Sequence, residues 1–378
     1  MLWIWRFALL ASALVSFKKL ILATKDERCA VYFGGKEYPG WRVQMLLTSV
    51  DSIRRMSEQP LKFLLYNFGD VLPAEAAMNV TASNIQIVSL PSLQESLTSL
   101  LGTSNVSPLF KYYIHAGKML AIHHAANECE QALILDYDTL ALANLQSIWD
   151  SLPGIDIAGP AEPETSAEHA QWGDWLQAHG WRLSALKLNE SMLEPMKDEL
   201  CQSLEVKVKP PAVELFQNSI IRLSTEALNL FKRSDSVRLY YYVLLRMMAG
   251  GACPDEAYAR KHNDSELLGG ACMSRARKAL DELHEAGWLP KGLGSGPIQY
   301  PASGRQHFIV EMLAMWIYLP CTGLTTQVFP RALVHNQPSK ARISKCEQMP
   351  ALLHTQRHRW DMGLEIKERC TARSHTEL

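Results

Sequence analysis

The stretch LILDYDTLALANLQSIWD, residues 133–150, places two acidic side chains directly after a short apolar run. The run predicts a buried strand, and the alternation of an extended chain would turn Asp136 and Asp138 toward the same side. Carboxylates that converge at a strand end offer the oxygen ligands that Mg²⁺ and Mn²⁺ prefer. A bare D-x-D is a frequent pattern, and its simplest alternative is a solvated acidic turn. The surroundings of the motif therefore decide its interpretation.

The segments around the motif alternate between strand and helix patterns. Strands are predicted at residues 29–35, 61–70, 85–93 and 131–136, and helices at residues 41–56 and 109–126. This order favours an α/β domain with a mostly parallel central sheet flanked by helices. Ligands of such sheets bind beyond the carboxyl ends of the strands, where Asp136 is expected.

The chain has an ordinary globular composition, with 378 residues, of which 47% are hydrophobic and 20% charged. This length suits one large domain with insertions or two smaller domains. The 38 basic and 39 acidic side chains give a net charge of -1, without the positive excess typical of nucleic-acid-binding proteins. In residues 273–297 basic side chains are interleaved with acidic ones, so a DNA-binding helix is not favoured there. Nucleic acid is not expected as a partner.

Residues 1–28 contain an apolar run between Arg6 and Lys18. This pattern is typical of a secretory signal peptide or signal anchor, and it is shorter than the ~20 apolar residues of an ordinary transmembrane helix. A buried or amphipathic N-terminal helix is the alternative. The prediction is entry into the secretory pathway, with membrane anchoring by the N-terminus in the Golgi or endoplasmic reticulum lumen, or secretion.

Two further features fit this route. The acceptor pattern for N-linked glycans, Asn-x-Ser/Thr, occurs at Asn79, Asn105, Asn189 and Asn263. These four occurrences predict that the protein is a glycoprotein. The eight cysteines form an even count without C-x-x-C spacing, which permits disulfides and disfavours a zinc ribbon. Their pairing cannot be inferred from spacing, and burial as small apolar side chains is the alternative.

The run DYDTLALANLQSIWD resembles the sugar-nucleotide-binding segment of glycogenin-like retaining glycosyltransferases, which have a GT-A fold. In that family D-x-D-T-L is followed by a short apolar strand, an asparagine, a hydrophobic pair and an acidic residue. The residues that fit are Asp136, Asp138, Thr139, Leu140, Leu142, Asn144, Leu145, Ile148, Trp149 and Asp150. The resemblance implies that Asp136 and Asp138 hold Mn²⁺ or Mg²⁺ beside the nucleotide-diphosphate sugar that serves as donor.

The resemblance also implies donor-binding residues elsewhere in the chain. Lys118 in HAGKMLAI has the place of the family's lysine on the helix before the motif, with an ordinary surface lysine as the alternative. In LFQNSIIRL, Asn218 and Ser219 match a strand that lines the sugar pocket. Ile220 stands where that strand has a glycine, which would allow close approach of the sugar.

Catalytic candidates come from the segment SGRQHFIVEML. It resembles the family's G-D-Q segment through Gly304 and Gln306, while Arg305 replaces the acid. We therefore assign Gln306 and Glu311 as catalytic candidates, with Glu311 substituting for the missing aspartate. The alternative is that Arg305 and Glu311 form the polar side of an amphipathic helix.

The family's late histidine and lysine have counterparts in LVHNQPSKAR. The resemblance implies that His335 is the third metal ligand and that Lys340 neutralises the leaving diphosphate. His354 and His358, four residues apart, precede a polar C-terminal run. They are interpreted as part of a solvated tail.

The resemblance implies a GT-A glycosyltransferase domain at 29–345, with a helical insertion at about 233–303 on the acceptor side and a C-terminal tail at 346–378. The expected function is metal-dependent, retaining transfer of a hexose from a UDP-sugar to a glycan or protein hydroxyl. Three alternatives stay open: a GDP-mannose-dependent enzyme similar to fungal-type α-mannosyltransferases, a non-catalytic nucleotide-sugar or glycan-binding relative, and a nucleotidyltransferase or phosphotransferase.

Overall fold

The structure is a computed structural model. It describes residues 27–35, 40–112, 114–160, 190–204, 206, 218–251, 253, 259, 262–268, 270–288, 296–297, 310–330, 332–336, 349–355, 360–361, 363–365 and 367–368.

A seven-stranded sheet forms the centre of the described fold, with the order β3-β2-β1-β4-β7-β6-β8. The strands are β1 (Arg28–Gly34), β2 (Lys62–Phe68), β3 (Ile85–Leu90), β4 (Gln131–Leu135), β6 (Ile157–Pro160), β7 (Ile220–Leu223) and β8 (Thr326–Phe329). Strand β7 runs antiparallel to β4 and β6, and the other neighbouring pairs are parallel. The predicted α/β class with a mostly parallel central sheet is confirmed.

A second, three-stranded sheet begins directly after the acidic motif. It consists of β5 (Thr139–Ala141), β10 (Leu352–His354) and β9 (Val334–Asn336), in the order β5-β10-β9. Strand β10 is antiparallel to β5 and parallel to β9. This small sheet brings the end of the chain beside the acidic motif, although more than two hundred residues separate β5 from β10.

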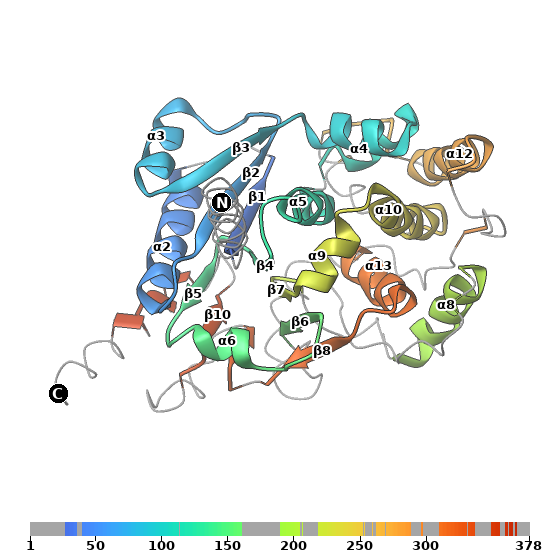
Figure 1. The fold of residues 1–378 in the computed structure, drawn as a ribbon. Helices are drawn as coiled ribbons and strands as arrows, with labels where there is room; N and C mark the ends of the chain where they lie inside the picture. Colours follow the sequence, from blue (N-terminus) through green and yellow to red (C-terminus); the bar gives the residue numbers. More distant parts are fainter. Residues whose placement is uncertain are drawn as a thin grey trace, which may run out of the picture.

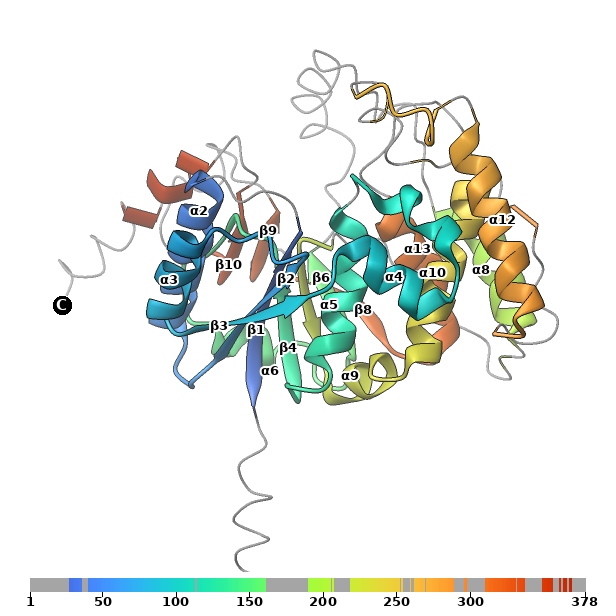
Figure 2. The same cartoon turned by 90° about the horizontal axis from the view of Figure 1, so that it is seen from above.

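Helices cover both faces of the central sheet (Figure 1). On one side lie α2 (Gly40–Met56) and α3 (Ala74–Ala82). On the other side lie α4 (Leu93–Leu101), α5 (Gly117–Ala125), α8 (Glu190–Ser203), α9 (Thr225–Phe231), α10 (Ser234–Ala249), α12 (Ala271–Glu285) and α13 (Val310–Tyr318), as Figure 2 also shows. The short helix α6 (Gln146–Asp150) follows β5. Two layers of helices therefore enclose the sheet.

Alternation along the strands produces two separate cores. Val31 packs in the cluster that contains α5 and α10, whereas its neighbour Tyr32 packs in the cluster that contains α2. Consecutive strand residues face opposite sides of a sheet, so an apolar run such as that of β1 is buried on both faces. The predicted insertion contributes α10, whose Tyr240 and Tyr241 are almost fully buried, so part of it belongs to the main core.

The predicted helix at residues 109–126 is correct only in its second half. The structure has two short 3-10 turns, at Pro108–Phe110 and Ile114–Ala116, before α5 begins. Tertiary packing overrides the helical period here, because Leu109 and Phe110 are buried in the core. At the start of α5, a Cβ on Gly117 would lie 3.2 Å from the ring of Phe68, so glycine allows the helix to approach β2.

Three disulfides settle the cysteine pairing in the described part of the chain. They join Cys29 to Cys129, Cys201 to Cys321, and Cys253 to Cys272. Cys346 and Cys370 lie outside the described residues. Such links stabilise a fold mainly by restricting the unfolded chain.

The predicted signal peptide or anchor lies almost entirely outside the described residues, which begin at residue 27. Across the described helices, none combines the length and the apolar character needed to cross a membrane.

Candidate active site

The acidic motif forms the turn between the two sheets. Asp136 follows β4, Asp138 precedes β5, and the Asp136 N–H donates a hydrogen bond to the Ser219 carbonyl at 2.9 Å. Between the two aspartates, the Tyr137 hydroxyl donates to the Phe33 carbonyl, and its ring stacks on Tyr32 with 6.2 Å between ring centroids. The end of β1 therefore holds the turn in place at the carboxyl end of the parallel strands.

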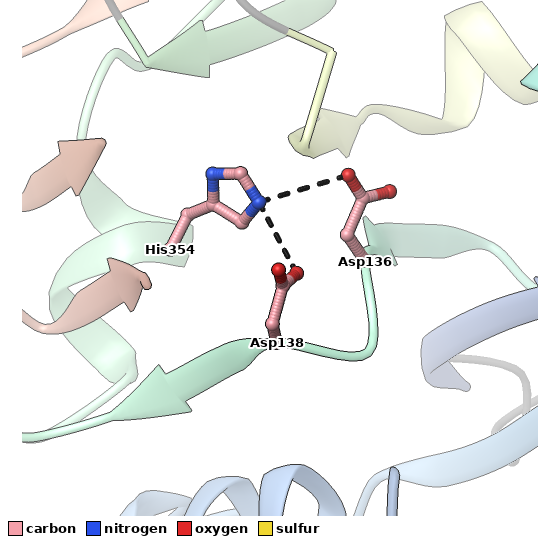
Figure 3. Close-up of side chains that lie close together, drawn as sticks. All are labelled: Asp136, Asp138 and His354. Atoms are coloured by element: carbon pink, nitrogen blue, oxygen red, sulfur yellow. Dashed lines mark ion pairs between the residues drawn. The ribbon is translucent and has the colours of Figure 1, made fainter. Parts of the chain in front are cut away.

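His354 completes a cluster with the two aspartates (Figure 3). Its Nε2 lies 3.1 Å from Asp138 Oδ1 and 3.8 Å from Asp136 Oδ2. Ligand atoms of the three residues all lie within 4.8 Å of one another. Two carboxylates and an imidazole are side chains that hold divalent cations in proteins.

The contact between Asp138 and His354 shifts the pKa values of the two groups in opposite directions. Burial alone would raise the pKa of Asp138, but the neighbouring His354 outweighs it and lowers the pKa of this carboxyl. Burial alone would lower the pKa of His354, and the contact with Asp138 raises it instead. A metal cation that binds here would take the neutral form of the imidazole ring.

The interpretation of His354 as part of a solvated tail is wrong. The residue is only 7% exposed, and its strand β10 pairs with β5. Thr355 closes the pairing, because its N–H and its hydroxyl both donate to the Asp138 carbonyl at 2.9 Å. A three-residue strand has too short a pattern to recognise locally. The tail predicted from residue 346 therefore contains at least one element of the fold.

The predicted ligand His335 lies in β9, where its backbone pairs with Leu353 next to His354. Its side chain is outside what the structure describes, so its role stays a prediction. Gln306 and Lys340 also lie outside the described residues, as does Arg305, and their roles stay predictions too.

Lys118 lies behind the cluster, at the start of α5. The side chain is only 3% exposed, and Nζ lies 3.0 Å from Asp136 Oδ1. The same ammonium group donates to the Asn218 carbonyl and lies 5.5 Å from the centre of the Phe33 ring. The alternative of an ordinary surface lysine is therefore wrong, because this positive charge is buried against a candidate metal ligand.

Asn218, Ser219 and Glu311 extend the site away from the aspartates. Asn218 Nδ2 donates to Glu311 Oε1 at 3.3 Å, and the Tyr240 hydroxyl donates to the Glu311 carbonyl at 3.3 Å. Glu311 is 2% exposed, and burial raises its pKa to about 8, so the carboxyl is mostly neutral at pH 7. Within the described residues, neither Ser219 Oγ nor Glu311 Oε2 has a hydrogen-bond partner. Buried polar atoms of this kind commonly meet a water or a ligand.

Ile220, which replaces the expected glycine, is accommodated in the core. Its side chain is fully buried in the apolar cluster on the α2 side of the sheet, together with Leu133 and Leu135. In β7 it pairs with Leu135 of β4, directly before the acidic motif. The substitution thus adds apolar packing beneath the strand end.

No family model matches the chain, and no curated protein sequence matches it.

Several solved structures of glycosyltransferases are similar in overall arrangement. The apo form of mouse xyloside xylosyltransferase 1 is 12% identical, with 88% of this chain and 99% of that chain covered and a TM-score of 0.40. Galactosyltransferase LgtC in complex with donor and acceptor sugar analogs is 10% identical, with 90% and 95% covered and a TM-score of 0.41. The glycosyltransferase GlyE of Streptococcus pneumoniae is 9% identical, with 91% and 60% covered and a TM-score of 0.37. Function is therefore inferred from the residues of the site.

Proposed function

We propose that this protein is a metal-dependent glycosyltransferase that moves a sugar from a nucleotide-diphosphate sugar to an acceptor hydroxyl. The observation that carries the proposal is the cluster of Asp136, Asp138 and His354 at the carboxyl end of β4. The motif that supplies both aspartates also resembles the donor-binding segment of retaining glycosyltransferases. Lys118, which this resemblance marks as a donor-site residue, contacts the same cluster.

The difficult step in this reaction is the departure of a negatively charged nucleoside diphosphate. A divalent cation held by Asp136, Asp138 and His354 would neutralise that developing charge. Lys118 contributes by holding the Asp136 carboxylate in one orientation, so that the ligand set is formed before the donor arrives. Lys340 is proposed to neutralise the diphosphate as well, and Gln306 to contact the reacting sugar.

The donor sugar is proposed to lie beside Asn218, Ser219 and Glu311. Ser219 Oγ and Glu311 Oε2 are buried polar atoms. Either atom can form a hydrogen bond with a sugar hydroxyl, as donor or as acceptor. A neutral carboxyl at Glu311 is a poor nucleophile, so we propose that the acceptor attacks from the face that the diphosphate leaves, with retention of configuration. A covalent sugar on Glu311, seen as an intact-mass increase during turnover, would refute this route.

A UDP-sugar is the favoured donor, a hexose the favoured sugar, and a glycan or protein hydroxyl the favoured acceptor, as the resemblance implies. We place the reaction in the Golgi or endoplasmic reticulum lumen, or in the secreted protein. Three disulfides support this location, because disulfides persist in oxidising compartments. The apolar run in residues 1–28 supports N-terminal membrane anchoring or a cleaved signal.

The test is release of UDP or GDP from a panel of nucleotide sugars by the full chain with Mn²⁺. We expect release from one donor, and loss of that release in Asp138→Asn and after chelation of the metal. The matched control is Asp51→Asn, which removes a carboxylate paired with Arg55 on the exposed side of α2.

Other outcomes lead to other functions. Release of GDP from GDP-mannose would favour the α-mannosyltransferase alternative. Metal-dependent donor binding without turnover would favour a non-catalytic binding relative. Formation of pyrophosphate or transfer of phosphate would contradict sugar transfer and favour a nucleotidyltransferase or phosphotransferase.

A further inference from the structure

The glycan-acceptor patterns fall into two structural groups. In the patterns at Asn79 and Asn263, the asparagine and the hydroxyl residue two positions later, Thr81 or Ser265, are exposed. In the pattern at Asn105, the asparagine is half-buried and the next residue, Val106, is fully buried. Asn189 lies outside the described residues and takes no part in the inference.

Asn263 lies at the tip of an anchored turn. Its backbone has φ of 51°, in the left-handed region that asparagine tolerates better than most residues. The next residue, Asp264, accepts hydrogen bonds from Lys111 Nζ at 2.7 Å and from the Tyr112 hydroxyl at 3.0 Å. The turn is thus fixed to the rest of the described fold through Asp264, while Asn263 itself is exposed.

Asn79 lies on the open side of α3. Within this helix only Val80 is buried, and the preceding Met78 is 66% exposed. A glycan on Asn79 would extend from the outer layer of the fold without displacing a core contact.

Asn105 is engaged in packing between two elements. Its Nδ2 donates to Glu282 Oε1 at 2.7 Å, and the other carboxylate oxygen of Glu282 accepts from the Thr103 hydroxyl. These hydrogen bonds lower the pKa of Glu282 and join the 3-10 turn Ser104–Val106 to α12. A sugar on Nδ2 would have to replace one of its two N–H groups and lie inside this contact.

We propose that Asn79 and Asn263 carry N-linked glycans and that Asn105 does not. In the step itself, Nδ2 forms a bond to the anomeric carbon of an oligosaccharide activated as a lipid diphosphate. The bond from that carbon to the diphosphate oxygen breaks, the diphosphate leaves with the electron pair, and a base of the host transferase takes one amide proton. The three disulfides are consistent with folding in the compartment that contains this oligosaccharide. The inference is independent of the proposed glycosyltransferase activity.

The test uses the full chain made in secreting animal cells. Treatment with peptide N-glycosidase in heavy-oxygen water converts each glycosylated asparagine into a labelled aspartate, which peptide mass spectrometry locates. We expect the label at Asn79 and Asn263 and none at Asn105. Thr81→Ala and Ser265→Ala should each remove one glycan while leaving the asparagine in place, and Ser107→Ala should leave the gel mobility of the chain unchanged.

Two results would overturn the inference. One is label at Asn105, which would mean that the contact with Glu282 does not protect the amide. The other is absence of label at Asn79 or Asn263 in the recovered chain. A chain that stays in the cytosol and therefore carries no label counts as the same result. Neither result bears on nucleotide release, so the glycan pattern and the proposed enzyme activity are tested separately.

Discussion

The buried Lys118 forms an ion pair with the half-buried Asp136, with Nζ of the lysine 3.0 Å from Oδ1 of the aspartate. The lysine lies on α5 and the aspartate directly after β4, so the pair joins a helix to the strand end that carries the acidic motif. The same ammonium donates to the Asn218 carbonyl, and Asn218 in turn contacts Glu311. One buried lysine therefore connects the candidate metal cluster to the candidate sugar-binding residues.

Lys118→Met should lower the free energy of unfolding by about 2 kcal/mol, because it leaves Asp136 and the Asn218 carbonyl without their partner. Urea unfolding measures the loss. The control is Lys62→Met, which removes a lysine paired with Glu128 at the surface and should cost less than about 1 kcal/mol. Equal losses of unfolding free energy in the two variants would show that the burial of Lys118 does not increase its contribution to stability.

His354→Ala should weaken Mn²⁺ binding at least about tenfold, because it removes one of three converging ligands. Isothermal titration with Mn²⁺ alone measures the affinity of the wild type and the variant. His335→Ala is the decisive comparison, since sequence analysis assigned that histidine as the third ligand. Weakening by His335→Ala and not by His354→Ala would restore the original assignment.

Tyr137→Phe should weaken Mn²⁺ binding by about tenfold with little change in fold, because the phenol that fixes the turn between the aspartates to the Phe33 carbonyl is lost. The same titration measures it. Tyr112→Phe removes a comparable hydroxyl from Asp264, away from the cluster, and should leave the affinity unchanged. An affinity equal to that of the wild type in Tyr137→Phe would mean that the ligands keep their geometry without this contact.

Glu311 should make the protein less stable as pH rises. Burial raises its folded-state pKa from 4.5 to about 8, so the folded protein holds this proton while the unfolded chain releases it. The carboxyl's contribution to stability is therefore full below pH 4.5 and is lost progressively up to about pH 8, at about 1.4 kcal/mol per pH unit.

Glu311→Gln keeps the shape of the side chain and removes the titrating proton. Relative to this variant, the wild type should lose free energy of unfolding between pH 5 and pH 8, measured by urea unfolding at each pH. Glu75→Gln, on the exposed start of α3, is the matched control. Parallel stability curves for the wild type and Glu311→Gln would contradict a neutral buried carboxyl.

Local patterns predicted the strands and the acidic motif because those features depend on residues that are consecutive in the sequence. Apolar runs mark β1, β2 and β4, and the D-x-D spacing sets Asp136 and Asp138 at the end of β4. The residues predicted from the family resemblance, Lys118 and Asn218, also lie beside that motif in the structure. Their roles in donor binding stay predictions.

Other parts of the site depend on contacts between distant segments. His354 belongs to a strand of only three residues, which exists because it pairs with β5 and β9. The buried, neutral state of Glu311 depends on packing by Tyr240 and on the approach of Asn218, neither of which is near it in sequence. The cysteine pairs are also contacts of this kind.

The sequence by itself thus determined the α/β class and the two aspartates, since strand periodicity and motif spacing are local properties of the chain. Only the tertiary structure decided that His354 joins those aspartates, that Lys118 is buried against them, and which of the described asparagine patterns are open to solvent. The physical reason is that burial and the pairing of charges are set by segments that meet only when the whole chain has folded.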